Sequence, residues 1–224
     1  MVGDTLMYII QLAGRARSGK TTMANMIASE IWKMGYIPVI LPFAKAIKDH
    51  VISLGISKEN NPLKYRNMCQ TLGAEKRAED PNFWVNKSDL YIIHYLAKEQ
   101  ERKKEKFPEF EFVLIQDDLR YMNELAWGRD VNAVQLFVSH GAREIEDNNA
   151  DWRSHESEAF NNYTQKRIRK RGSSLYLLGE EELFSFVIDN SNSLPELKDT
   201  VIKNIGKWLA DGGLDILGDI HEST

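Results

Sequence analysis

Residues 7–21 read MYIIQLAGRARSGKT, an apolar run that passes directly into a glycine-rich loop. The apolar run, 7–13, is short and continuous, which is typical of a buried strand. The loop, 14–21, matches the pattern G-x-x-x-x-G-K-[ST] in full. The segment after it, 22–34, places apolar side chains on one helical face and ends before Gly35. A strand, a glycine-rich loop and a helix in this order are the context in which the pattern binds phosphate.

Strand-like and helix-like segments alternate along the rest of the chain. This alternation predicts an α/β fold with a mainly parallel central sheet flanked by helices. The predicted strands are 7–13, 36–41, 110–115, 131–138 and 184–188. The predicted helices are 22–34, 43–54, 62–76, 82–100 and 195–209. We expect a single domain over 1–212 and a frayed tail over 213–224, because the end of the chain is glycine-rich and acidic.

Composition excludes several classes of protein. Hydrophobic residues make up 42% of the 224 residues and charged residues 28%, which argues against a disordered or fibrous chain. The net charge of -4 disfavours bulk binding of nucleic acid. No apolar run approaches the roughly 18 residues of a transmembrane helix. Cys69 is the single cysteine, which excludes an intrachain disulfide. These features predict a soluble protein of the reducing cytoplasm, with no membrane partner.

The glycine-rich loop carries the chemistry of a triphosphate site. Its glycines let the backbone curl so that successive N–H groups point at phosphate oxygens. We expect the ammonium group of Lys20 to reach the β- and γ-phosphates and the hydroxyl of Thr21 to ligate Mg²⁺. The helix that follows presents its positive N-terminal end to the same anion. The residues expected to hold ATP are Gly14, Arg15, Ala16, Arg17, Ser18, Gly19, Lys20, Thr21 and Thr22.

A second polar surface is predicted on the helix that starts at Pro62. Arg66, Gln70, Gly73 and Arg77 are offset by 4, 7 and 11 residues, which places them within roughly 60° on one helical face. Arginine binds phosphate with two hydrogen bonds, glutamine can contact a base edge or a sugar, and the glycine leaves room beside them. The alternative is a set of surface arginines with incidental spacing.

The residues that follow the strand 110–115 form another candidate centre, because ligands of open α/β sheets bind at the carboxyl ends of strands. We expect a turn there, with the sequence QDDLRYMNE over 116–124. A carboxylate such as Asp118 can hold magnesium-bound water or a substrate hydroxyl, and Arg120 can neutralise the transferring phosphoryl charge. The alternative is that Asp117 caps a helix while Asp118 pairs with Arg120.

A long polar segment separates the last two predicted strands, and such insertions are often lids. We expect a lid over about 140–160, with Arg143 or Arg153 bringing further positive charge to the phosphoryl group. The run 166–171, KRIRKR, is uniformly basic. We interpret it as a solvated insertion, and contact with phosphate or nucleic acid is the alternative.

Five sequence elements together resemble a known family. Besides the loop 14–21, they are FAKAIK at 43–48, the spacing R-x3-Q-x2-G-x3-R-x6-W that ends at Trp84, DLRYMNE at 118–124 and HESE at 155–158. In this order and spacing, over about residues 7–205, the chain resembles the bacteriophage-type deoxynucleoside monophosphate kinases, which are P-loop nucleoside monophosphate kinases.

This resemblance implies a P-loop kinase fold with an acceptor-binding helical region over about 43–100. It also implies transfer of the γ-phosphoryl group of ATP to a deoxynucleoside monophosphate with Mg²⁺, in the host cytoplasm if the chain is phage-encoded. The residues implied at the acceptor are Phe43, Lys45, Arg66, Gln70, Arg77, Trp84, Asp118, Arg120 and Glu158. Those implied at the transfer centre are Lys20, Asp118, Arg120, Arg143 and Arg153, with Thr21 and Asp118 at the metal and Asn190 at the adenine.

Two other functions stay open at the level of sequence. A P-loop kinase of another small acceptor, such as dephospho-coenzyme A or a sugar acid, would share the loop but not the deoxynucleotide substrate. An ATP-regulated nucleic-acid-binding protein would use the basic run 166–171 and bind DNA in a salt-sensitive way. The helix that carries Arg66, Gln70 and Arg77 favours a small phosphorylated acceptor, without stable binding of nucleic acid. Base preference and the choice between monomer and homodimer also stay open.

Overall fold

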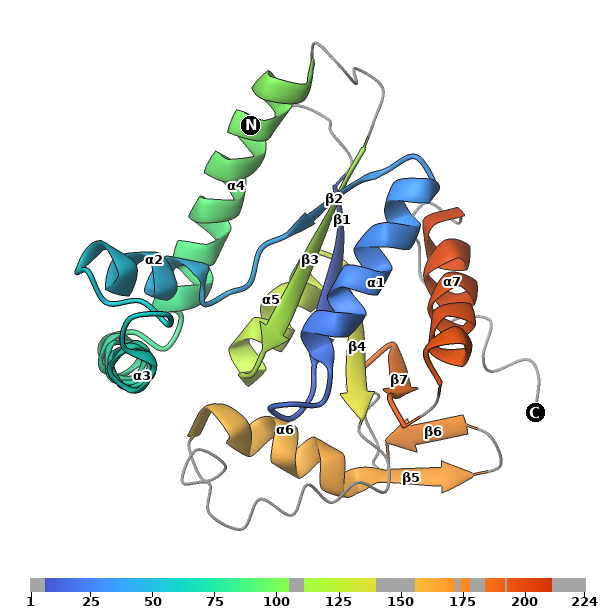
Figure 1. Cartoon of the computed structure of the whole chain (residues 1–224). Helices are drawn as coiled ribbons and strands as arrows, with labels where there is room; N and C mark the ends of the chain where they lie inside the picture. Colours follow the sequence, from blue (N-terminus) through green and yellow to red (C-terminus); the bar gives the residue numbers. More distant parts are fainter. Residues whose placement is uncertain are drawn as a thin grey trace. The chain divides into compact units, whose positions relative to one another are not determined.

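The computed structural model describes residues 7–104, 111–139, 156–171, 174–177, 184–191 and 193–210. These residues fall into two units (Figure 1). The sheet unit contains the described residues of 6–40 and 111–224, and the helical unit contains those of 41–110.

A five-stranded, all-parallel sheet forms the centre of the sheet unit. Its strands are β1 (Met7–Ala13), β2 (Ile37–Ile40), β3 (Phe112–Leu119), β4 (Val134–Ser139) and β7 (Phe186–Asp189), in the order β2-β3-β1-β4-β7. All five overlap the predicted strands, so the prediction of an α/β fold with a mainly parallel sheet is confirmed. β1 lies between β3 and β4, as its continuous apolar run requires of a strand covered on both faces.

The helices α1 (Lys20–Lys33) and α7 (Leu194–Ala210) lie side by side on one face of this sheet (Figure 1). The core beneath them is formed by Tyr8, Ile10, Leu12, Val113, Ile115, Leu136 and Val138 of the strands and by Met23, Ile27, Ile31, Val201 and Ile205 of the helices. Burying one such side chain stabilises the fold by about 1.5–3 kcal/mol. This packing holds the start of α1, and the loop before it, at the carboxyl ends of the strands.

The other face of the sheet carries α5 (Met122–Asp130) and a row of three buried glutamines, Gln11, Gln116 and Gln135, in register on neighbouring strands. Nε2 of Gln135 donates to Oε1 of Gln11 at 2.7 Å, and Nε2 of Gln11 donates to Oε1 of Gln116 at 2.9 Å. A Cβ atom at Gly128 of α5 would lie 1.9 Å from Oε1 of Gln11. The glycine therefore lets α5 pack directly on the glutamine row.

β3 extends four residues beyond the predicted strand, which ends at Ile115. The predicted turn over 116–124 is therefore wrong for residues 116–119. Gln116 stays in the strand because it pairs with Gln11 in the ladder between β1 and β3, and the side-chain amide of Gln11 also donates to its Oε1. Between Gln116 and Leu119, β3 holds one residue more than the stretch of β1 that it pairs with. This β-bulge lies where the two aspartates reach the carboxyl edge of the sheet.

Four elements between β3 and β7 were not among the predicted ones. They are α5, α6 (Glu156–Arg167), β5 (Ile168–Arg171) and β6 (Ser174–Leu177), of which the last two form an antiparallel hairpin. Hydrophobic periodicity did not reveal α6 because its sequence, ESEAFNNYTQKR, is polar on most of its surface. The basic run 166–171 spans the end of α6 and β5.

Three helices form the helical unit, and all three were predicted from the sequence. They are α2 (Lys45–Ser53), α3 (Pro62–Glu79) and α4 (Phe83–Lys104). α3 starts at the predicted residue, because the sequence carries two signals for a helix N-terminus there. Pro62 occupies the first helical turn, and the side chain of Asn61 accepts the backbone N–H of Lys64 at 3.1 Å.

Several predictions fall outside the described residues. Arg143 and Arg153, the two candidate lid arginines, lie there, as does the tail 213–224. The predicted lid 140–160 lies there too, except for its last five residues, which begin α6. Among the described residues, no helix has the length and apolar character needed to span a membrane.

Candidate functional site

The loop 14–21 lies at the carboxyl edge of the sheet, where two neighbouring strands send their helices to opposite faces. β1 continues through the loop into α1, whereas β3 continues into α5 on the face of the glutamine row. Open parallel sheets bind their ligands at such a change in direction, because the two connections diverge there. This edge of the sheet is therefore the candidate site.

Glycine is required at both ends of the loop. Gly14 has a φ of 142° and Gly19 a φ of 92°, values that other residues rarely adopt. A Cβ atom would lie 2.5 Å from the carbonyl oxygen of Val138 at the first position and 2.2 Å from Nδ2 of Asn190 at the second. Arg17 is also left-handed, with a φ of 65°. The two glycines thus allow the backbone to curl tightly against β4 and the residue after β7.

The end of the loop presents groups suited to an anion. α1 begins at Lys20, so the positive end of its dipole lies at the loop. The hydroxyl of Ser18 is buried and has no hydrogen-bond partner among the described residues. A buried polar group left in this state costs about 1–3 kcal/mol, which a phosphate oxygen would offset. Of the other residues expected at the nucleotide, Arg15 is half-buried, while Arg17 and Thr22 are exposed.

The side chain of Lys20 folds back onto the loop. Its Nζ donates to the carbonyl oxygen of Gly14 at 2.7 Å and to that of Arg15 at 2.8 Å. Burial, followed by the positive charge of Arg120, lowers the pKa of Lys20 to about 8 against the opposing effect of nearby carboxylates. The charged form still dominates at pH 7, so the site offers an ammonium group inside a curl of backbone.

Thr21 and Asp117 form the pair best suited to a metal. The hydroxyl of Thr21 donates to Oδ2 of Asp117 at 2.8 Å. No cluster of three or more potential side-chain ligands occurs among the described residues. Mg²⁺ needs no such cluster, because it typically keeps several waters and takes one or two carboxylates together with substrate phosphates. The two oxygen donors therefore fit a nucleotide-bound Mg²⁺.

The sequence prediction assigned the metal to Asp118, whereas the carboxylate bonded to Thr21 belongs to Asp117. Successive side chains of a regular strand point to opposite faces, but a β-bulge interrupts this alternation. Asp117 and Asp118 lie at the bulge of β3, and the negative charges of both carboxylates oppose the lowering of the pKa of Lys20. Asp118 is buried, and its negative charge raises the pKa of Glu124 on α5.

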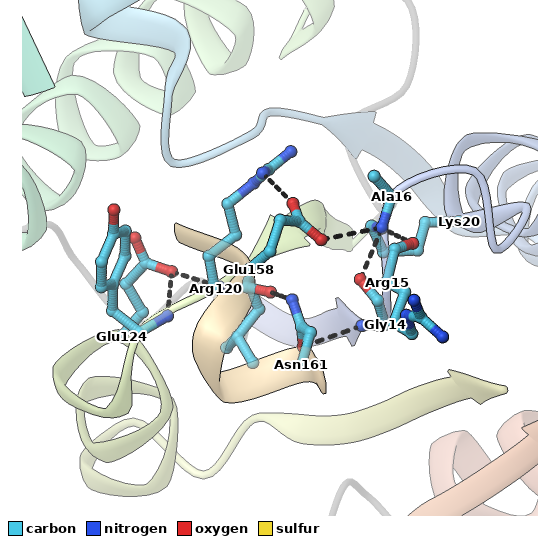
Figure 2. A network of polar contacts seen from close by, with 10 residues as sticks. Gly14, Arg15, Ala16, Lys20, Arg120, Glu124, Glu158 and Asn161 are labelled. Carbon is cyan, nitrogen blue, oxygen red and sulfur yellow. Dashed lines mark hydrogen bonds and ion pairs between the residues drawn. The ribbon is translucent and has the colours of Figure 1, made fainter. Parts of the chain in front are cut away.

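Arg120 and Glu158 join the end of β3 to the loop through α6 (Figure 2). Nη1 of Arg120 lies 2.5 Å from Oε1 of Glu158. The other carboxylate oxygen, Oε2, accepts the backbone N–H of Ala16 at 2.9 Å. Glu158 is buried, so these two donors offset most of the cost of removing its charge from water.

Asn161 makes a second connection between α6 and the loop (Figure 2). Its Oδ1 accepts the backbone N–H of Gly14 at 3.1 Å, and its Nδ2 donates to the carbonyl oxygen of Leu119 at 3.2 Å. The residue is fully buried. One side chain of α6 thus links the start of the loop to the end of β3.

Glu124 closes the turn between β3 and α5. Its Oε2 accepts the backbone N–H of Arg120 at 2.7 Å and that of Tyr121 at 3.2 Å. Burial, followed by the negative charge of Asp118, raises the pKa of Glu124 to about 8. This carboxyl group holds the backbone from which the side chain of Arg120 extends toward Glu158 (Figure 2).

Asn190, which the family resemblance places at the adenine, bonds to the loop itself. Its Nδ2 donates to the carbonyl oxygen of Ser18 at 2.8 Å, and its backbone N–H donates to the carbonyl oxygen of Ser139, also at 2.8 Å. In this structure the side chain supports the loop from the end of β7.

In the helical unit, the space left by Gly73 is filled by a guanidinium group. A Cβ atom at Gly73 would lie 3.1 Å from Nη2 of Arg77. The indole Nε1 of Trp84 donates to the carbonyl oxygen of Gly73 at 3.0 Å, which ties α4 to α3. On the same helix, Gln70 is half-buried and Arg66 is exposed.

Lys45 takes part in a polar cluster of the helical unit. Its Nζ pairs with Oδ1 of Asp49, and the hydroxyl of Tyr91 donates to the other carboxylate oxygen at 2.6 Å. Phe43, two residues before Lys45, is buried.

The structure therefore divides the predicted site residues between the two units. The sheet unit brings together Lys20, Thr21, Asp118, Arg120 and Glu158 at one end of its sheet. The helical unit contains Phe43, Lys45, Arg66, Gln70, Arg77 and Trp84.

The sequence analysis left three residues of the site unassigned. They are Glu124, Asn161 and Asp117, the last of which accepts a hydrogen bond from Thr21. Alternation along the strand does not separate Asp117 from Asp118, because the bulge interrupts it there. The spacing of Glu124, three residues after Tyr121, is that of a capping box. Asn161 has no such signal, since its partners lie far away in the chain.

Comparison with protein-family models finds no matching family, and comparison with curated proteins finds no relative of this chain. The functional assignment therefore depends on the chemistry of the site.

Proposed function

We propose that the protein transfers the γ-phosphoryl group of ATP to a deoxynucleoside monophosphate, giving ADP and the deoxynucleoside diphosphate. The observation that carries the phosphoryl-transfer part is the convergence of Lys20, the N-terminal end of α1 and the Thr21–Asp117 pair on one glycine-rich loop. These groups supply cationic charge, backbone donors and metal ligands at one end of the sheet. This combination supports a P-loop site for a magnesium-bound triphosphate.

The protein's part in such a reaction is positioning and electrostatic stabilisation. The N–H groups of the loop and the ammonium group of Lys20 would hold the phosphates. Thr21 and Asp117 would hold Mg²⁺, which supplies neutralisation of phosphate charge when it is bound. Arg120 adds a guanidinium group on the same edge of the sheet, near enough to Lys20 to lower its pKa. Its charge would stabilise the equatorial oxygens of the transferring group.

The assignment of the acceptor rests on the helical unit and on the family resemblance. Arg77 packs over Gly73, and Gln70 and Arg66 precede them on the same helix. Guanidinium groups bind a phosphate monoester with paired hydrogen bonds, and an amide can contact a base or sugar. A small phosphorylated acceptor matches these groups.

A coupled ADP-release assay across all deoxynucleoside and ribonucleoside monophosphates tests this proposal, with Lys20→Ala as the inactive control. We expect turnover with at least one deoxynucleotide that depends on both acceptor and Mg²⁺. Turnover with dephospho-coenzyme A or a sugar acid alone would reassign the acceptor. Salt-sensitive binding of DNA without acceptor-dependent ADP release would replace the kinase with a nucleic-acid-binding protein.

A further inference from the structure

The groups of the loop that a phosphate would use are bonded to the protein itself. The N–H of Ala16 donates to Glu158 at 2.9 Å, and the N–H of Gly14 donates to Asn161 at 3.1 Å. The ammonium group of Lys20 donates to two carbonyl oxygens of the same loop. Figure 2 shows these contacts around the loop and α6.

The two side chains of α6 differ in what they offer. Asn161 is neutral, and it also donates to the carbonyl oxygen of Leu119, so it anchors α6 to β3 as well as to the loop. Glu158 is an anion that accepts from a backbone N–H of the loop and from the guanidinium group of Arg120. A phosphate oxygen in the same loop would seek these same two kinds of donor.

We propose that Glu158 is an internal competitor of the nucleotide phosphates, an inference that rests on the proposed function. In the ligand-free protein its carboxylate accepts the N–H of Ala16 and forms an ion pair with Arg120. A bound triphosphate takes over both donors, and the carboxylate turns away. Asn161 keeps α6 attached during this exchange, so rotation of the Glu158 side chain is sufficient.

This exchange couples nucleotide binding to the position of Arg120. The guanidinium group passes from a carboxylate to the phosphoryl group only when a nucleotide is present. The cost is affinity, because a site that is competent for a fraction of the time has a raised apparent Kd. If the self-bonded state makes up about 90% of the ligand-free protein, the apparent Kd is raised about tenfold.

The test is calorimetric binding of ATP with Mg²⁺, and separately of inorganic tripolyphosphate, to the full chain and to Glu158→Gln. The amide keeps the shape of the side chain but removes the competing charge. We expect Glu158→Gln to bind both ligands about 3- to 10-fold more tightly than the unchanged protein does. Asp130→Asn is the matched control, because it removes one negative charge from the exposed end of α5 at the opposite edge of the sheet. It should leave both Kd values unchanged.

Hydrogen exchange of the Ala16 amide tests the contact without any nucleotide. Exchange should be slow in the ligand-free protein, faster in Glu158→Gln, and slow again in that variant when tripolyphosphate is bound. If Glu158→Gln binds both ligands as tightly as the unchanged protein or more weakly, Glu158 does not compete with the phosphates. The proposed kinase function would not be affected by that result. Failure of the unchanged protein to bind either ligand would remove both.

Discussion

Lys20 is the residue whose charge the site depends on most directly. Its ammonium group sits within the loop and donates to carbonyl oxygens there, and burial lowers its pKa to about 8. A lysine is charged below its pKa, so the cation that attracts phosphate is complete well below pH 8 and is lost above it.

We therefore expect the affinity for a triphosphate to fall as pH rises from 7 to 9. Bound phosphate stabilises the ammonium form, so the loss can approach tenfold per pH unit above about pH 8. Calorimetric Kd values across this range would measure it, with Lys20→Met as the control that removes the titrating group. A fall of equal slope in that variant would show that another group is responsible.

Asp117 and Asp118 allow a matched pair of substitutions one residue apart. Asp117→Asn removes the carboxylate that accepts from Thr21, so it should raise the Mg²⁺ concentration needed for half-maximal turnover at least about tenfold. Asp118→Asn leaves the contact between Thr21 and Asp117 in place and should change this requirement less. Initial rates over a Mg²⁺ titration decide between them, and the reverse ranking would return the metal to Asp118.

At the scale of elements, α5 is placed by a glycine and by a carboxyl group. Gly128 lets the helix approach the glutamine row, and Glu124 closes the turn that leads from β3 into the helix. Neither contact involves an apolar stripe, which explains why a helix of nine residues can be stable here without strong periodicity.

Gly128→Ala should destabilise the fold by about 1–3 kcal/mol. The new Cβ atom would lie 1.9 Å from Oε1 of Gln11 and 2.4 Å from Nε2 of Gln135, so the buried amides would have to move. Gly206→Ala in α7 is the control, because its Cβ atom would meet only Cε of Met34, at 3.5 Å. That variant should be as stable as the unchanged protein or up to about 1 kcal/mol more stable. Urea unfolding of both would show the contrast, and equal stabilities would contradict it.

Glu124→Gln should change how stability depends on pH. The folded state raises the pKa of this carboxyl group from an ordinary value of 4.5 to about 8. Its contribution to stability is therefore complete below about pH 4.5 and is lost as pH rises through 8. Glutamine is neutral throughout and can still accept both backbone N–H groups. The stability of the variant relative to the unchanged protein should therefore increase between pH 5 and 8.5. Thermal unfolding at several pH values measures this, and parallel curves for the two proteins would exclude it.

At the scale of the whole molecule, the two units divide the work that we propose. The sheet unit holds the groups for the triphosphate and the metal, and the helical unit holds the guanidinium groups suited to the acceptor. Kinetic constants for the two substrates should therefore respond to substitutions in different parts of the chain.

Arg77→Ala should weaken binding of the acceptor by about 2–5 kcal/mol, the scale for losing one partner of a buried charge pair. The KM for ATP should change little. Gly73→Ala should act in the same direction but less, since its Cβ atom would displace the guanidinium group from 3.1 Å without removing it. Steady-state kinetics with each substrate varied in turn measures both, and an equal loss for ATP would mean that Arg77 is structural.

The sequence by itself determined β1, the loop and α1, together with the parallel α/β class. These depend on neighbours in the chain, because an apolar run, two glycines at a set spacing and a helical stripe each act over a few residues. The same holds for the start of α3, which Asn61 and Pro62 specify locally.

Only the tertiary structure decided which carboxylate meets Thr21. Both aspartates lie at the bulge of β3, so alternation along the strand does not assign a face to each. The contact between Asp117 and Thr21 depends on the order of the strands and on the packing of α1 against them. The length of β3 was decided in the same way, because Gln116 stays in the strand by pairing with Gln11 of β1, 105 residues earlier.

The contacts of α6 are the furthest from any sequence signal. Glu158 reaches Ala16 across 142 residues and Asn161 reaches Gly14 across 147. Polar side chains on a polar helix carry no periodicity that names their partners, and a hydrogen bond depends on positions to within a few tenths of an ångström. Such positions exist only once the fold has placed both segments, so the contacts between the loop and α6 are a product of the tertiary structure.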